Sequence, residues 1–127
     1  MELILDTNAV SSLLAGDKEL ARVLTKTDQH HLPLIVIGEY QYGLLALRQQ
    51  RRYGALFSRL ESDSVILYPD RETADWYASI RHDLKQRGQP IPEGDLWIAA
   101  LARQYSLEIV SRDHHFDLVE SIRRIDW

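Results

Sequence analysis

Short apolar runs rich in β-branched residues alternate along the chain with segments in which apolar residues recur every three or four positions. Runs of the first kind predict strands, and the longer period predicts amphipathic helices. The predicted strands are residues 3–5, 34–37, 64–68, 107–110 and 122–125. Pro33 is expected to open the second strand and Pro69 to stop the third. Strands separated by helices predict an α/β fold with a parallel sheet.

Helices are predicted in the intervals between these strands. Asp17 is placed to cap one of them, and a long helix runs from about Asp70 to Arg87, with Gly88 placed to end it. The expected apolar faces are Leu20, Val23 and Leu24; Tyr40, Gly43, Leu44 and Leu47; Tyr53, Leu56, Phe57 and Leu60; Tyr77, Ile80 and Leu84; and Ile98, Leu101, Ala102 and Tyr105. The element order is then β-α-α-β-α-α-β-α-α-β-β. We predict one domain over residues 1–127, an α/β/α sandwich with a central, mainly parallel sheet of four or five strands.

Length and composition narrow the class of protein. A chain of 127 residues is expected to form one domain around one core. The absence of Cys excludes disulfides, a thiolate nucleophile and any zinc site with a Cys ligand. No apolar run approaches the roughly 18 residues that cross a bilayer, and the first residues lack the basic start of a leader peptide. We therefore expect a cytoplasmic protein that does not enter the membrane.

The net charge of −4 argues weakly against a protein that coats duplex nucleic acid, because such proteins are usually basic. Four acids gathered at one site would account for that whole excess. Arg48, Arg51, Arg52 and Arg59 form a basic run, which is either a solvated face or a contact for RNA phosphates. Charge alone does not decide between these classes.

Four acids occur where ligands bind in parallel α/β sheets, beyond the carboxyl ends of the strands. Asp6 follows the first predicted strand directly, Glu39 comes two residues after the second, and Asp113 comes three residues after the fourth. Asp95 begins the helix that precedes that fourth strand. Carboxylates so gathered repel one another unless a cation holds them, and oxygen ligands suit Mg²⁺ or Mn²⁺.

Each acid also has an ordinary structural explanation. Asp6, followed by Thr7 and Asn8, is equally a strand-to-helix cap. Asp95 and Glu39 are commonplace in a first helical turn, and Asp113 in a turn. One shared cation explains four acids at one edge of the sheet more simply than four separate accidents do.

Four short motifs occur in a fixed order along the chain. They are Leu5-Asp6-Thr7-Asn8; Gly38-Glu39 with Tyr42-Gly43; Asp95-Leu96-Trp97-Ile98-Ala99-Ala100; and Ser111-Arg112-Asp113 with Phe116. This set resembles the PIN-domain ribonucleases, and in particular the VapC-type toxins of type II toxin–antitoxin pairs. The resemblance extends over the whole chain, from Met1 to the terminal Ile125-Asp126-Trp127.

The resemblance implies roles for particular residues. The acidic metal-binding positions of the family match Asp6, Glu39, Asp95 and Asp113, which would be both the catalytic and the metal-binding residues. Ser111 falls where the family often has a hydroxyl that orients a metal-bound water, and Asn8 matches a polar residue that helps order the site. Thr7 and Asp117 are second-rank candidates, the latter equally explained as a solvated surface acid. Gly94 departs from relatives, which often carry Asn or another polar residue at this position.

The activity implied is Mg²⁺- or Mn²⁺-dependent endonucleolytic hydrolysis of RNA, with water as nucleophile and 5′-phosphate products. The implied partners are the RNA substrate and a VapB-type antitoxin, whose C-terminal segment blocks the acidic groove. Family members are commonly homodimers, and the apolar Tyr40–Leu47 region is a candidate interface. The alternatives are a non-toxin PIN nuclease in RNA processing or decay, and a catalytically inert PIN-like interaction module.

Other α/β functions lack their required residues. A receiver domain needs paired acids after the first strand and a Lys after a late strand, but Leu5 precedes Asp6 and Arg112 follows the late strand. Phosphate-binding glycine loops are also absent from the sequence. His114 and His115 follow Asp113, but neighbouring loop residues do not readily serve one site, and we assign neither a role.

Overall fold

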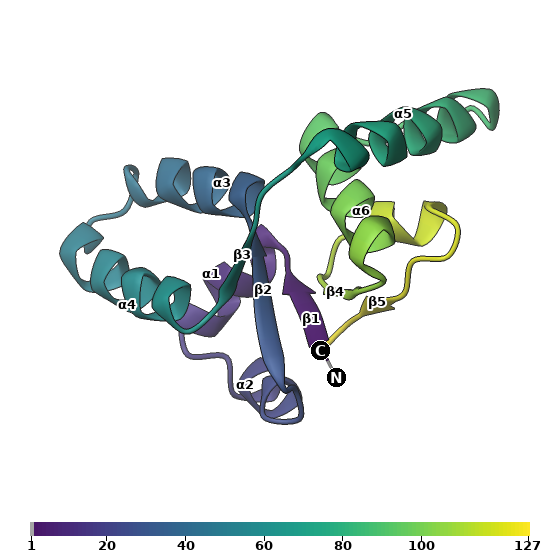
Figure 1. Ribbon diagram of the computed structural model, residues 1–127. Helices are drawn as coiled ribbons and strands as arrows, with labels where there is room; N and C mark the ends of the chain where they lie inside the picture. Colours follow the sequence, from purple (N-terminus) through teal and green to yellow (C-terminus); the bar gives the residue numbers. More distant parts are fainter. Residues whose placement is uncertain (1) are drawn as a thin grey trace.

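The computed structural model, which describes residues 2–127, contains a single five-stranded sheet (Figure 1). Its strands are β1 (Glu2–Leu5), β2 (Gln29–Pro33), β3 (Val65–Leu67), β4 (Glu108–Val110) and β5 (Arg124–Ile125). They lie in the order β3-β2-β1-β4-β5, and all four neighbouring pairs are parallel. The predicted fold class and the predicted order of elements are confirmed.

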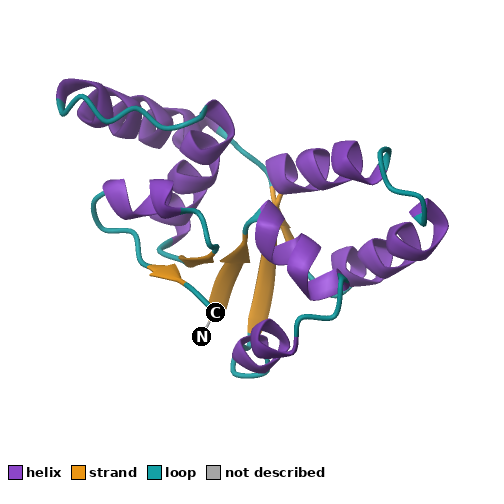
Figure 2. Cartoon of the chain, turned by 180° about the vertical axis from the view of Figure 1, so that it is seen from behind, coloured by secondary structure: helices purple, strands orange, loops and turns teal. Residues whose placement is uncertain are grey.

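Six α-helices and one 3₁₀ helix connect the strands. They are α1 (Thr7–Leu14), α2 (Lys18–Leu24), α3 (Leu34–Leu44), α4 (Gln50–Ser62), α5 (Arg71–Gln86), α6 (Glu93–Tyr105) and the 3₁₀ helix η1 (His114–Leu118). The chain crosses from β1 to β2 to β3 in one direction and then returns past β1 to β4. Right-handed crossovers therefore place α1–α4 on one side of the sheet and α5 and α6 on the other, as Figure 2 shows from behind.

Strand β1 is the centre of the core, with a neighbouring strand on each side and helices on both faces. Leu3, Ile4 and Leu5 are fully buried, as are Ile109 and Val110 of the neighbouring β4. A strand that is buried on both faces requires an uninterrupted apolar run, and Leu3-Ile4-Leu5 is such a run. The reversal of strand order between β1 and β4 brings the carboxyl ends of these two strands together.

The prediction of a strand at residues 34–37 is wrong. These residues are the first turn of α3, and the second strand is instead the preceding segment Gln29–Pro33. A short apolar run does not distinguish a buried strand from a buried helix. The helix is favoured because Val36 and Tyr40, four residues apart, are both buried, and Tyr40 stacks on Phe57 of α4 with ring centroids 4.6 Å apart.

Strand β2 escapes recognition because its sequence is polar. Its residues pair in parallel with both β1 and β3, so backbone hydrogen bonding rather than side-chain pattern defines the strand. His31 is nevertheless buried. As a consequence, Glu39 does not stand two residues after a strand, but lies six residues beyond Pro33, within α3.

Several residues of the predicted apolar faces are exposed. Leu56 and Tyr105 lie on the outer sides of α4 and α6, and Leu47 lies beyond the end of α3. Within α4 only Phe57 is fully buried, because this helix lies beside α3 at one edge of the molecule, with most of its surface exposed (Figure 1). A purely periodic assignment makes the buried face of such a helix too wide.

Helix α5 has the predicted ends. The Asp70 carboxylate accepts a hydrogen bond from the Thr73 backbone N–H, and the Thr73 hydroxyl accepts one from the Asp70 N–H, which together form a capping box. Gly88 follows the helix with a φ of +67°, a conformation that other residues adopt only at a cost. No helix within residues 2–127 is both long and apolar enough to cross a membrane.

The helical assignment of residues 34–44 can be tested with glycine. Gly38 lies inside α3, and a β-carbon added there would meet no atom within 4 Å. We expect Gly38→Ala to raise the free energy of unfolding by about 0.5–1 kcal/mol, measured by urea denaturation, because Ala favours a helix. Gly88→Ala is the matched control and should lower it by about 1 kcal/mol, because φ is positive there. Destabilisation by Gly38→Ala would contradict the helix.

Candidate functional site

Asp6 anchors the site at the carboxyl end of β1. Its side chain is almost completely buried and caps α1, with Oδ1 accepting the Thr7 backbone N–H at 2.8 Å. Oδ2 accepts hydrogen bonds from the Ser111 hydroxyl at 2.6 Å and the Asn8 amide at 3.1 Å. Burial raises the pKa of the Asp6 carboxyl, the hydrogen bond from Ser111 opposes that rise, and the negative charge of Asp113 adds to it. The capping role and the site role therefore coexist in one residue.

Asn8 and Ser111 tie the loop after β4 to the start of α1. Besides donating to Asp6, the Ser111 hydroxyl accepts hydrogen bonds from the Asp113 N–H at 2.9 Å and the Asn8 amide at 3.1 Å. Asn8 also accepts the Arg112 N–H at 3.1 Å. One donor and two acceptor positions are the full capacity of a hydroxyl. In this arrangement Ser111 holds Asp6 and Asp113 in place and has no hydrogen-bonding position left with which to orient a water.

Asp95 lies in the first turn of α6, at the edge of the same site. Its Oδ2 is 2.9 Å from Nδ1 of His115, and its side chain is only 13% exposed. The pKa of Asp95 is raised to about 6, chiefly by burial, and further by the negative charges of Asp113 and Asp6, against the hydrogen bond from His115. Two neighbouring carboxylates thus act on Asp95 directly.

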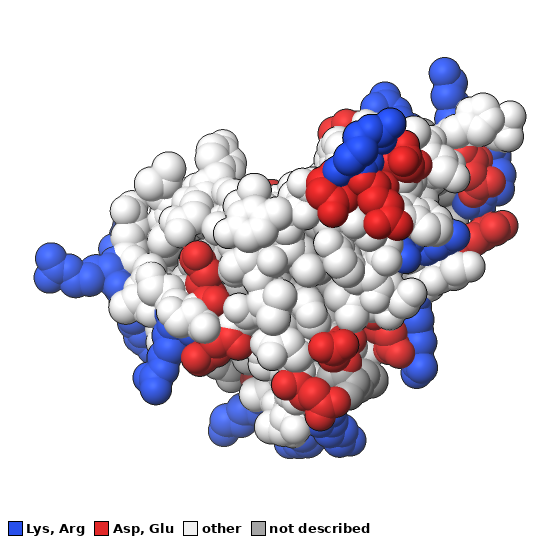
Figure 3. All heavy atoms as spheres, viewed as in Figure 1, with Lys and Arg blue, Asp and Glu red and all other residues white. Residues whose placement is uncertain are grey.

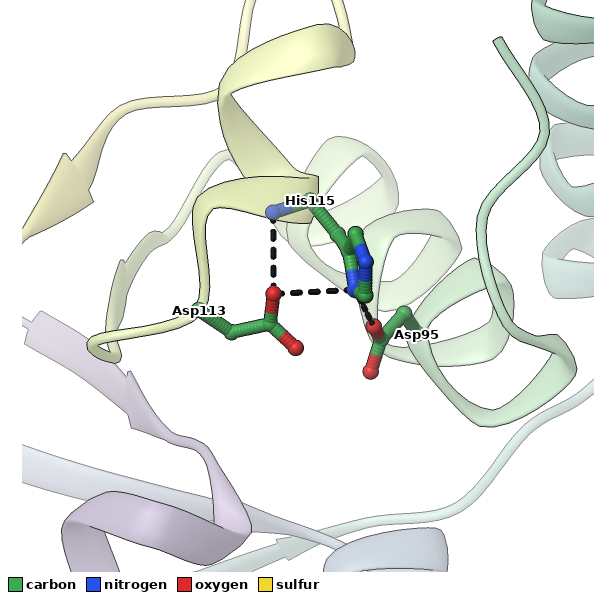
Figure 4. Close-up of side chains that lie close together, drawn as sticks. All are labelled: Asp95, Asp113 and His115. Atoms are coloured by element: carbon green, nitrogen blue, oxygen red, sulfur yellow. Dashed lines mark hydrogen bonds and ion pairs between the residues drawn. The ribbon is translucent and has the colours of Figure 1, made fainter.

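Asp113 and His115 come from the turn that begins η1. The Asp113 carboxylate caps this turn, with Oδ1 accepting the His115 N–H at 2.9 Å. The same oxygen lies 2.9 Å from the His115 Nδ1. Figure 4 shows the imidazole between the carboxylates of Asp95 and Asp113. Donor atoms of these three side chains all lie within 4.8 Å of one another, close enough to share a cation.

Glu39 approaches from the opposite side of the sheet, on α3. Its Oε1 accepts a hydrogen bond from the Thr7 hydroxyl at 3.0 Å, and Oε2 is 3.5 Å from the position that a β-carbon of Gly94 would occupy. Gly94 therefore brings the start of α6 against Glu39. Partial burial raises the pKa of Glu39, the Thr7 hydrogen bond opposes the rise, and the charge of Asp6 adds to it. Thr7 belongs to the site through this contact.

Asp117 stands apart from the four acids. Arg124 donates to both of its carboxylate oxygens, at 2.9 and 3.1 Å, and Nδ1 of His114 lies 3.0 Å from Oδ2. The hydrogen bond from Arg124 holds the pKa of Asp117 below its ordinary value. The structure thus gathers Asp6, Glu39, Asp95 and Asp113 and places Asp117 in a separate ion pair.

His115 is the site residue that sequence reasoning missed. The only available signal was its position two residues after Asp113, and the adjacent His114 gave the same signal. The two histidines diverge because the turn of η1 directs His115 to Asp95 and His114 to Asp117. Hydrogen bonding to Asp95 raises the pKa of His115, and the charge of Asp113 adds to the rise against partial burial.

The basic run lies away from these acids. Arg48, Arg51, Arg52 and Arg59 are exposed on and before α4, and none of them pairs with an acid among the ion pairs of residues 2–127. Blue side chains project from the α3–α4 edge in Figure 3. No Lys or Arg in the described part of the chain pairs with Asp6, Glu39, Asp95 or Asp113 either, so His115 is the basic side chain that touches the cluster.

Comparison with known proteins places this geometry in context. The PIN domain family matches residues 3–121. Toxin FitB of Neisseria gonorrhoeae is 31% identical over 122 residues, covering 87% of each chain, and VapC ribonuclease Y4jK of Sinorhizobium fredii is 28% identical, covering 87% of this chain and 86% of its own. The crystal structure of DNA-bound VapBC from Salmonella typhimurium superposes with a TM-score of 0.88 at 25% identity, covering 100% of this chain and 98% of that one. Since the family match spans nearly the whole chain, including the positions of all four acids, the protein belongs to the PIN-domain family.

Proposed function

We propose that this PIN-domain protein is a divalent-metal-dependent endoribonuclease and the toxin of a VapBC-type toxin–antitoxin pair. The observation that carries the proposal is the convergence of Asp6, Glu39, Asp95 and Asp113 from four parts of the fold onto one edge of the sheet, without a Lys or Arg paired to them in residues 2–127. Relatives named as ribonucleases and as a toxin support the same conclusion.

The donor set fits a hard divalent cation. Four carboxylates offer only oxygen ligands, which is the chemistry that Mg²⁺ and Mn²⁺ prefer. Burial raises the pKa values of Asp6, Glu39 and Asp95, and the negative charges of neighbouring carboxylates add to the rise. A bound cation would offset that repulsion. We assign the cation, Mg²⁺ or Mn²⁺, to these four residues.

The bound cation and the residues of the site would have different roles in phosphodiester hydrolysis. When bound, the cation supplies positive charge that offsets the charge on a phosphodiester and makes water more acidic. Asp6 is held in a single orientation by the Thr7 N–H, Asn8 and Ser111, so its position is set before RNA arrives. Ser111 and Asn8 act as positioning residues. Attack by water at phosphorus, with breakage of the bond to the 3′-oxygen and protonation of that leaving oxygen, would leave 5′-phosphate and 3′-hydroxyl ends.

The partner assignment rests on the toxin–antitoxin structures that this fold matches. The FitAcB complex of Neisseria gonorrhoeae superposes with a TM-score of 0.78 at 26% identity, and DNA-bound VapBC of Salmonella typhimurium with 0.88 at 25%. By analogy, we assign a VapB-type antitoxin to this chain. Tyr42, Leu45 and Leu47 expose apolar surface on the α3–α4 hairpin, whereas Tyr40 of the candidate dimer region is buried in the core. Only the exposed part of that region is available for a homodimer.

Nuclease activity is tested with the purified chain and a structured RNA of mixed sequence in Mg²⁺ or Mn²⁺. We expect Asp6→Asn to lower the initial cleavage rate by about 100-fold or more, because it removes the best-oriented carboxylate. The control is Asp75→Asn, which changes an exposed acid paired with Arg71 on α5. Its initial cleavage rate should stay within about twofold of the wild-type rate. Cleavage that survives both EDTA and Asp6→Asn would overturn the assignment.

The cost of gathering the acids is tested by thermal unfolding in EDTA. The pKa of Asp95 in the folded state, about 6, exceeds the ordinary value of 3.8, so stability is lost as the pH rises through the window between them. We expect the Tm of Asp95→Asn at pH 7.5 to be about 5 °C higher than that of the wild-type protein. This difference in Tm should vanish near pH 4. Asp75→Asn should show no such pH dependence. A Tm of Asp95→Asn below that of the unchanged chain at pH 7.5 would contradict the electrostatic account.

The toxin role is tested separately from catalysis. Induced expression of the chain in a bacterial host without an antitoxin is expected to arrest growth, whereas Asp6→Asn expressed to the same level should not. Growth that continues despite active ribonuclease in the lysate would favour a processing nuclease over a toxin.

A further inference from the structure

His115 places a nitrogen atom inside the acidic cluster. Its Nδ1 is 2.9 Å from Oδ2 of Asp95 and 2.9 Å from Oδ1 of Asp113, and both contacts reach the same side of the ring (Figure 4). The backbone supports this placement, because the His115 N–H donates to Asp113 at 2.9 Å and so fixes the turn that carries the ring. The imidazole is therefore held in place by the same carboxylate that it contacts.

These separations match the spacing of ligands around a cation. Adjacent ligands of a six-coordinate ion with bonds of about 2.1 Å lie about 3 Å apart. The two N···O distances of 2.9 Å are of this size. An ion bound among these three side chains would therefore reach both carboxylates and the His115 nitrogen together.

The neighbouring histidine is engaged elsewhere. Nδ1 of His114 lies 3.0 Å from Asp117 and 3.1 Å from Nη2 of Arg124, which places it in the separate ion pair of η1 with β5. His114 and His115 therefore differ in environment although they are adjacent in the chain. That difference provides a matched control.

We propose that His115 is a nitrogen ligand of the divalent cation at this site and makes the site favour first-row transition-metal ions over Mg²⁺. The proposal rests on the proposed metal site and adds its metal preference. Imidazole binds transition metals in the order Mn²⁺ < Co²⁺ < Ni²⁺, whereas Mg²⁺ prefers oxygen. A site of carboxylates alone would lack this bias.

A second arrangement predicts the opposite behaviour. If the protonated imidazole only took the place of a metal ion, as a stand-in that pairs with Asp95 and Asp113, a cation would have to displace it. Removing the ring would then tighten the binding of every divalent ion, Mg²⁺ included. The sign of the change in affinity separates a ligand from a stand-in.

The direct test is pulsed EPR of Mn²⁺ bound to the full chain, with natural or ¹⁵N-labelled histidine. We expect a nitrogen coupling that changes with the label, that persists in His114→Ala and that is lost in His115→Ala. Mn²⁺ bound without histidine coupling overturns the role of His115 and leaves the carboxylate site standing. No Mn²⁺ bound overturns both. Coupling that survives His115→Ala assigns the nitrogen to another histidine and overturns the proposal.

Calorimetric titration with Co²⁺ and Mg²⁺ provides the second measurement. We expect His115→Ala to raise the Kd for Co²⁺ by about 10-fold or more, and that for Mg²⁺ by less than about threefold. His114→Ala should leave both unchanged within about twofold. Equal weakening of both ions by His115→Ala, or tighter binding of both, contradicts a nitrogen ligand. Unfolding curves of each variant exclude loss of fold as the cause.

Discussion

The buried hydrogen bond between the Ser111 hydroxyl and the Asp6 carboxylate, 2.6 Å long, joins the two strands whose carboxyl ends meet at the switch point of the sheet. Asp6 directly follows β1 and Ser111 directly follows β4, so the bond depends on these strands being neighbours in parallel register. The same hydroxyl receives the Asp113 N–H. One oxygen atom thus couples the sheet topology to the position of two acids.

Electrostatic repulsion is the constraint that this junction opposes. Burial raises the pKa values of Asp6 and Asp95, and the negative charge of Asp113 adds to the rise at both. An ordinary protein core would separate such groups or pair them with Arg. Here the nearby Arg side chains make their contacts outside the cluster. Arg124 pairs with Asp117 and Asp126, and Arg112 packs on the Trp127 ring. Stability given up at a site in this way is typical of sites built for chemistry rather than for packing.

The peripheral contacts still matter to the site. Arg124 donates to the Ser111 carbonyl at 3.0 Å, and Arg112 packs on Trp127, whose indole N–H donates to Asp17 at the start of α2. These contacts hold the loop that carries Ser111 and Asp113 in place. The C-terminal residues therefore support the geometry of the acids without touching them.

The sequence by itself determined the α/β class, the order of elements and both ends of α5, and it led to the proposal of Asp6, Glu39, Asp95 and Asp113 as the site. Each of these depends on local information: apolar periodicity, capping residues, a glycine with positive φ, or a motif read in order. It did not locate β2, because a polar segment becomes a strand only by pairing with strands on both sides, and it misread residues 34–37, because the burial of Val36 and Tyr40 depends on α4.

The tertiary structure also decided which neighbours of the acids belong to the site. Ser111 uses its one donor and both acceptor positions in hydrogen bonds with Asp6, Asp113 and Asn8. Asp117 pairs with Arg124. His115 contacts Asp95 within the acidic cluster, whereas His114 contacts Asp117 outside it. No local pattern distinguishes these outcomes, since adjacent residues of a loop share the same sequence context. The direction in which each side chain points is set by the register of β4 against β1 and by the turn of η1, and both depend on contacts between residues far apart in the chain.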